Sequence, residues 1–291
     1  CDDRGDGFHA QYYFDTCFYQ MGILDRVDRY DVIGPSSAVA NSLGSRVKNT
    51  ANQLIGDTHE VYQKILWNSG DLSRALVCDG GLNNGGTGAD KSQDWEKLEE
   101  FMDDHPNNPG NFFAGDDMAE DWIALGHISA INYRGKYMSY ALVTGDHNTV
   151  CAAVTPFVYR NTAMPIGPDV TYAFAGCPGI NDFDVMTGVA PCFVDQSYEL
   201  LDDPARGATM IQAAPNDNGT TARCVLSGFA FDSIRDDLPL PQGLQTAQDR
   251  CVQLYDIITW FQNIIDEPVG VDPVAFENSL SDNYPNPFNP T

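Results

Sequence analysis

The sequence predicts an α/β fold, in which a parallel sheet is covered by helices on both faces and carries a β-rich extension or inserted subdomain. Two observations lead to this prediction. Up to about residue 126, short apolar stretches alternate with amphipathic stretches, the order expected of parallel strands joined by crossover helices. Over roughly 130–220, apolar stretches follow one another between Gly, Pro and Asn clusters, which is typical of antiparallel strands. The α/β domain is predicted to span 1–265.

The first half of the chain contains four strand–helix pairs, of which the first strand is represented only by its end. The strands are predicted at 1–7, 29–37, 62–73 and 111–117. Helices are predicted at 10–23, 42–56, 93–104 and 118–126. The helical stretches repeat apolar residues every three or four positions, as Tyr13, Cys17 and Met21 do in the first of them.

The second half is predicted to be mostly strands, followed by one long helix. The strands are expected at 136–145, 151–160, 170–179 and 222–233, the last of which returns to the main sheet. The closing helix is expected at 244–265, with one face formed by Cys251, Tyr255, Ile258 and Ile265. Residues 266–273, "DEPVGVDP", have the composition of a linker.

Net charge limits the partners. The chain has 41 acidic and 16 basic side chains, a formal net charge of -25. Such a surface repels nucleic-acid phosphates, so no nucleic-acid partner is predicted. No apolar run approaches the roughly 20 residues that span a bilayer, so no transmembrane segment is predicted.

The cysteines indicate an oxidising compartment. None of them forms a CxxC pair, which disfavours zinc-ribbon, thioredoxin and c-haem sites. An even number at wide spacing is typical of disulfides in secreted proteins, whereas buried free thiols are the alternative. The eight are Cys1, Cys17, Cys78, Cys151, Cys177, Cys192, Cys224 and Cys251.

Acidic residues follow three of the predicted parallel strands. Because ligands bind at the carboxyl ends of strands in open α/β sheets, these carboxylates are predicted to converge and could hold Ca²⁺. The candidate metal ligands are Asp2, Asp3, Asp6, Asp71, Asp116 and Asp117. Helix capping and turn formation by the same side chains, and a catalytic role, are the alternatives.

The stretch "FFAGDDMAEDW" has the strand–turn–helix order of a nucleophile elbow. Hydrolases and amidotransferases with this geometry place Ser or Cys at the tip, whereas Asp116 and Asp117 occupy it here. No catalytic residue and no cofactor other than a possible Ca²⁺ are therefore predicted. The chain is expected to be non-enzymatic, with a metal-dependent hydrolase of peptide or glycan as the alternative.

Two stretches resemble known families. The segment "NYPNPFNPT" at 283–291 is similar to the opening of the C-terminal sorting domain of bacterial type IX secretion substrates. This resemblance implies that 266–291 contain a linker and the start of a sorting region, which the secretion machinery recognises. It also implies that the chain is processed or belongs to a longer product.

The body of the chain resembles the class I glutamine amidotransferase-like, or flavodoxin-like, scaffold of large secreted proteins. The residues that carry this resemblance are "YFD", "RYDVIGPSS", "ILWNSGDL", "NFFAGDDMAEDW" and "LSGFAFDSI". It implies a flavodoxin-like sheet without the amidotransferase nucleophile. The expected protein is extracellular or at the outer cell surface, with a structural, adhesive or self-assembling role in a filament or matrix. Its expected partners are further copies of itself or a cell-surface component.

Overall fold

The computed structural model of the 291-residue chain describes the residues that form the central sheet and its helices. The described residues are 10–27, 62–70, 77, 94–104, 109–115, 117–124, 128–145, 157–160, 171–174, 184–188, 194–200, 208–213, 222–231, 234–235 and 250–262. The predicted strand at 29–37 and helix at 42–56 lie outside them. Within the described ranges, no helix has both the length and the apolar character needed to cross a membrane.

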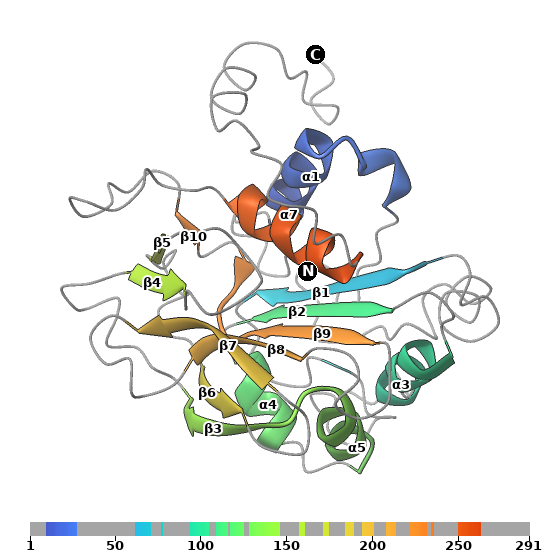
Figure 1. Ribbon diagram of the computed structural model, residues 1–291, viewed down its shortest axis with the longest axis vertical. Helices are drawn as coiled ribbons and strands as arrows, with labels where there is room; N and C mark the ends of the chain where they lie inside the picture. Colours follow the sequence, from blue (N-terminus) through green and yellow to red (C-terminus); the bar gives the residue numbers. More distant parts are fainter. Residues whose placement is uncertain are drawn as a thin grey trace, which may run out of the picture.

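Helices and strands alternate in the first half of the chain and strands dominate the second (Figure 1). The helices are α1 (Ala10–Gln20), the 3-10 helix η1 (Leu24–Arg26), α3 (Asp94–Asp104), α4 (Met118–Ala124), α5 (Ile128–Tyr137) and α7 (Arg250–Phe261). The strands are β1 (Lys64–Gly70), β2 (Gly110–Gly115), β3 (Tyr140–Thr144), β4 (Phe157–Arg160), β5 (Thr171–Phe174), β6 (Val185–Gly188), β7 (Val194–Leu200), β8 (Ala208–Ala213), β9 (Arg223–Ser227) and β10 (Ile234–Arg235).

The described strands form one mixed sheet with a parallel core. Its main order is β1-β2-β9-β8-β7-β4-β5-β10, and β6 pairs with both β3 and β8. β2 lies parallel to β1 on one side and to β9 on the other, whereas β8 and the strands beyond it pair antiparallel. The predicted α/β class with a parallel core is confirmed, and β9 returns to that core as predicted. The flavodoxin-like assignment and the boundaries of the extension stay predictions.

Helices pack on both faces of the sheet, as the α/β prediction requires (Figure 1). Alternate residues of a strand point to opposite faces. In β2, Phe112 and Ala114 pack with α1 and α7, whereas Phe113 packs with α3, α4 and α5. β2 is buried along its whole length because it lies in the middle of the parallel core.

α1 ends earlier than its apolar spacing predicts. Gly22 has a φ of 68°, a left-handed conformation that favours glycine. The N–H of Ile23 donates to the carbonyl of Phe18 at 3.0 Å, and the N–H of Gly22 donates to that of Tyr19 at 3.0 Å. This pair of bonds is a Schellman motif, which ends the helix before Met21. The predicted helix over 10–23 is therefore shortened to Ala10–Gln20.

α5 was not predicted from the sequence, and the strand expected to start at residue 136 begins only at Tyr140. The helix buries Ser129, Ala130, Tyr133 and Tyr137, which share one face. Its apolar Ile128 and Ile131 are exposed, so the apolar pattern of the sequence does not mark the buried face. The predicted strand over 136–145 therefore contains the end of α5 as well as β3.

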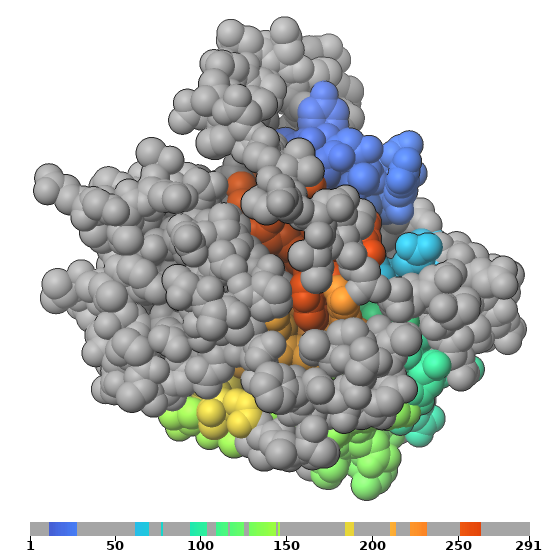
Figure 2. Space-filling model, in the orientation of Figure 1, coloured from blue at the N-terminus to red at the C-terminus, as the bar shows by residue number. Residues whose placement is uncertain are grey.

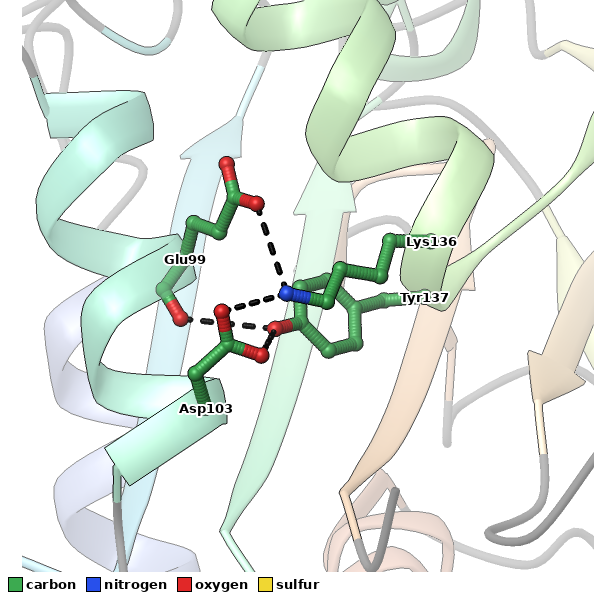
Figure 3. A network of polar contacts seen from close by, with 4 residues as sticks. All are labelled: Glu99, Asp103, Lys136 and Tyr137. Atoms are coloured by element: carbon green, nitrogen blue, oxygen red, sulfur yellow. Dashed lines mark hydrogen bonds and ion pairs between the residues drawn. The ribbon is translucent and has the colours of Figure 1, made fainter. Parts of the chain in front are cut away.

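A polar network on the surface joins α3 to α5 (Figure 3). The Lys136 ammonium group is paired with the carboxylate of Asp103 and lies 3.5 Å from that of Glu99. The Tyr137 hydroxyl donates to the Asp103 carboxylate and to the backbone carbonyl of Glu99, the latter at 3.4 Å. The Lys136 side chain is 36% exposed, so water screens both ion pairs.

We expect Lys136→Ala to lower the free energy of unfolding by less than about 1 kcal/mol, because exposed ion pairs contribute little. Urea denaturation at low and high salt measures the effect, and the difference between variant and wild type should shrink as salt rises. A loss of several kcal/mol would show that the network is far less screened than its exposure indicates.

A buried hydrogen bond joins α5 to the sheet beneath it. The side-chain amide of Asn111 in β2 donates to the hydroxyl of Tyr133 at 2.6 Å, and both residues are fully buried. Burial raises the pKa of the Tyr133 hydroxyl well above its usual value, so it stays protonated. The Asn111 amide oxygen has no hydrogen-bond partner in the described structure. The bond to Tyr133 is therefore the interaction that offsets the burial of the Asn111 side chain.

We expect Tyr133→Phe to destabilise the fold by about 1–2 kcal/mol, because it leaves the Asn111 amide buried without its acceptor. Urea denaturation measures the loss. The matched control is the double variant Asn111→Leu/Tyr133→Phe, which removes both polar groups and should recover most of it. Equal stability of Tyr133→Phe and wild type would contradict the role given to this bond.

Cys17 and Cys251 form a disulfide between α1 and α7. Their Cα atoms are 4.7 Å apart, within the normal range, although the two residues are separated by 234 positions in the sequence. Atoms of α1 and α7 lie beside one another on the face drawn in Figure 2. Cys224 is buried and takes part in no disulfide among the described residues. The remaining cysteines lie outside the described residues.

Candidate functional site

The carboxyl ends of β1, β2 and β9 lie together at one edge of the parallel core, where ligands bind in α/β folds. Ser69 at the end of β1 donates its hydroxyl to the carbonyl of Ala114 in β2 at 3.3 Å. Ser227 at the end of β9 donates to the carbonyl of Phe229 at 2.8 Å. Both serines are buried and bonded to backbone groups, so they hold the strand ends in place.

Of the six acidic residues predicted as metal ligands, the structure describes Asp117, which is partly buried just before α4. The other five, Asp2, Asp3, Asp6, Asp71 and Asp116, lie outside the described residues. The convergence of all six carboxylates stays a prediction.

Asp117 belongs to a carboxylate cluster that also contains Glu120 and Asp184. One oxygen from each of the three side chains lies within 4.8 Å of the others. Asp117 and Glu120 are three positions apart, which places them on the same side of the first turn of α4. Asp184 immediately precedes β6, and its backbone N–H donates to the carbonyl of Gly228 at 2.8 Å. The cluster therefore combines the end of β2, the start of α4 and the start of β6.

Two glycines leave room for the cluster. A Cβ atom at Gly145 would lie 1.9 Å from Oε2 of Glu120, so the Glu120 carboxylate occupies the space of the missing side chain. A Cβ atom at Gly228 would lie 2.6 Å from the backbone oxygen of Asp184 and 2.8 Å from its Cβ. Any residue other than glycine at position 145 or 228 would therefore collide with Glu120 or Asp184.

Asp184 is the most constrained member of the cluster, with 0% of its surface exposed. Its Oδ2 accepts a hydrogen bond from the backbone N–H of Glu120 at 2.8 Å, whereas its Oδ1 has no hydrogen-bond partner in the described structure. Burial raises the pKa of this carboxyl to about 8. The backbone N–H groups of Glu120 and Ala119 oppose this rise in pKa, whereas the negative charges of Asp117 and Glu120 add to it.

The cluster can do one of two things chemically. Without a cation, Asp184 holds a proton at neutral pH, which removes one of three negative charges from a small volume. With a divalent cation, all three side chains are ionised and act as oxygen ligands. Sequence reasoning could have included Glu120, because the spacing to Asp117 is helical. Asp184 lies 64 positions beyond Glu120, and no local pattern marks it.

Comparison of the chain with protein-family models, with curated proteins and with solved structures finds no match in any of the three.

Proposed function

We propose that the chain is an extracellular or outer-surface protein with a non-catalytic structural, adhesive or self-assembling role. The observation that carries this proposal is the Cys17–Cys251 disulfide. Disulfides persist in oxidising compartments and are rare in reducing ones. The bridge links helices α1 and α7, which come from opposite ends of the described chain. The resemblance of 283–291 to a type IX sorting motif supports the same compartment, and we propose that the secretion machinery recognises this region.

The non-catalytic part of the proposal rests on the turn between β2 and α4. In the sequence, Asp116 and Asp117 stand where acyl-transfer enzymes of the amidotransferase-like scaffold carry Ser or Cys. The serines near this edge, Ser69 and Ser227, are buried and bonded to backbone oxygens rather than to a general base. We favour self-association by addition of a strand from a neighbouring chain, with the Pro-rich segment 283–291 as the donor.

Two measurements test these proposals on the secreted protein. Intact mass after alkylation, with and without reduction, counts the disulfides, and full alkylation without reduction would contradict the oxidised state. Light scattering after size exclusion, together with negative-stain microscopy at high concentration, reports assembly. A chain that stays monomeric throughout the concentration range would overturn the self-assembling role but not the extracellular one.

A second candidate, a metal-dependent hydrolase of peptide or glycan, is favoured by the carboxylate cluster alone. Catalytic metal sites keep an open position for water or substrate. The complete burial of Asp184 instead favours a closed site. A broad panel of peptide and glycan substrates, assayed with wild type and with Asp117→Asn, separates the two functions. Cation-dependent hydrolysis that Asp117→Asn abolishes would establish the enzyme.

A further inference from the structure

We propose that Asp117, Glu120 and Asp184 form a Ca²⁺ site that joins the start of α4 to the start of β6. This site does not depend on the proposed function, because a structural cation serves a surface protein and a hydrolase equally well. The inference rests on three observations about the cluster: the spacing of its oxygens, the unpaired oxygen of Asp184, and the space that two glycines provide.

The ligand atoms indicate the class of cation. All three side chains offer carboxylate oxygens, which suit hard divalent cations rather than Zn²⁺ or Cu²⁺. Ca²⁺ binds oxygen at about 2.3–2.6 Å, so it can bridge two oxygens that lie up to roughly 5 Å apart. The oxygens of the cluster lie within 4.8 Å of one another, so small side-chain movements bring all three within reach of one Ca²⁺ ion. Mg²⁺ needs shorter bonds of about 2.0–2.1 Å in a near-octahedral geometry and usually keeps several waters, so a partly buried set of three carboxylates suits Ca²⁺ better.

The unpaired oxygen of Asp184 points to a ligand independently of the cluster's charge. Asp184 is completely buried, and its Oδ1 has no hydrogen-bond partner in the described structure. A buried carboxylate oxygen without a partner is costly, and side chains in this position are normally paired or bound to a metal. A cation held between the three carboxylates would supply the missing partner.

Helix capping explains only part of this arrangement. The bond from the Glu120 N–H to Oδ2 of Asp184 satisfies one free donor in the first turn of α4. A neutral side chain such as Asn would make the same bond. Capping accounts neither for the unpaired Oδ1 nor for the two further carboxylates nearby, whose negative charges repel that of an ionised Asp184. A divalent cation turns this repulsion into attraction.

The glycines are consistent with a built site. Gly145, just after β3, leaves the space in which the Glu120 carboxylate lies. Gly228, just after β9, lets the backbone of Asp184 come close. Four segments that are distant in the sequence therefore meet at the cluster, and a bound cation would hold them together.

Calcium titration of the full chain tests the site. The titration is done in 0.15 M NaCl, which screens non-specific attraction of Ca²⁺ to the acidic surface. We expect calorimetry to show one Ca²⁺ site in the wild type. Asp184→Asn and Glu120→Gln should each lower the Ca²⁺ affinity of this site at least tenfold. Saturating Ca²⁺ should raise the midpoint of thermal unfolding of the wild type by about 5 °C and that of both variants by less. The charge-matched control is Asp25→Asn, an exposed residue of η1, which should bind and melt as the wild type does.

Several outcomes would overturn the proposal. They are an absence of Ca²⁺ binding by the wild type, equal affinity of Asp184→Asn and wild type, and equal loss of affinity in Asp25→Asn. Equal binding of Mg²⁺ would overturn the choice of Ca²⁺. If Asp184→Asn does not fold, Glu120→Gln carries the comparison, because Glu120 is only partly buried and tolerates an amide.

Discussion

Replacing both Cys17 and Cys251 with Ala is expected to lower the free energy of unfolding by about 2–5 kcal/mol. The loop that the disulfide closes is long, since the residues are 234 positions apart, and the unfolded chain gains much conformational freedom once it opens. The folded state loses contacts as well, because both cysteines are buried among α1, α7 and the sheet. Urea denaturation of unreduced variant and wild type measures the loss.

The single variants provide the control for this experiment. Cys17→Ala and Cys251→Ala each remove the same bridge, so either should destabilise the chain about as much as the double variant does. Non-additive losses of this kind distinguish a disulfide from two separate packing defects, which would add. If the two single losses summed to the double loss, or if the double variant were as stable as the wild type, the bridge would not contribute as proposed.

The parallel core could be predicted because each of its elements carries its own periodicity. β2 is buried along its whole length, and its apolar Phe112, Phe113 and Ala114 are consecutive, as expected of a strand buried on both faces. α3 has Trp95, Leu98 and Met102 on one face, and its predicted start and end lie within one residue of those observed. α5 could not be predicted, because its buried face contains Ser129 and two tyrosines whereas Ile128 and Ile131 are exposed. Packing against α3 and β2 decides its orientation.

The candidate site could be predicted only where it follows the strand-end rule of α/β sheets. Asp117 directly follows the β2 region, so topology alone places it at the carboxyl edge. Asp184 reaches the same place because β6 pairs with β8, and β8 in turn pairs with β9. These antiparallel pairings connect segments far apart in the sequence, and a local pattern contains no information about them. The residue that most distinguishes the cluster was therefore the one that sequence reasoning missed.

Gly228→Ala is expected to destabilise the chain by about 3 kcal/mol without Ca²⁺ and also to weaken Ca²⁺ binding. The new Cβ would lie 2.6 Å from the backbone oxygen of Asp184, so the backbone itself must move. That movement also disturbs the bond from the Asp184 N–H to the Gly228 carbonyl, which aligns Asp184 with the end of β9. Urea denaturation in a chelator gives the stability. The control is Gly135→Ala in α5, where a new Cβ would have no neighbouring atom within 4 Å. This substitution should raise the stability of the chain slightly, because alanine favours helix more than glycine does.

Gly145→Ala separates the cost of crowding from the loss of a ligand. Its new Cβ would lie 1.9 Å from Oε2 and 2.6 Å from the carboxyl carbon of Glu120, which form the end of a flexible side chain. Glu120 can rotate away, so stability without Ca²⁺ should change by less than about 1 kcal/mol. The rotation nevertheless removes one carboxylate from the cluster, and Ca²⁺ affinity should fall as it does in Glu120→Gln. An unchanged titration would show that Glu120 is not a ligand, whereas a large loss of stability would show that its side chain cannot move.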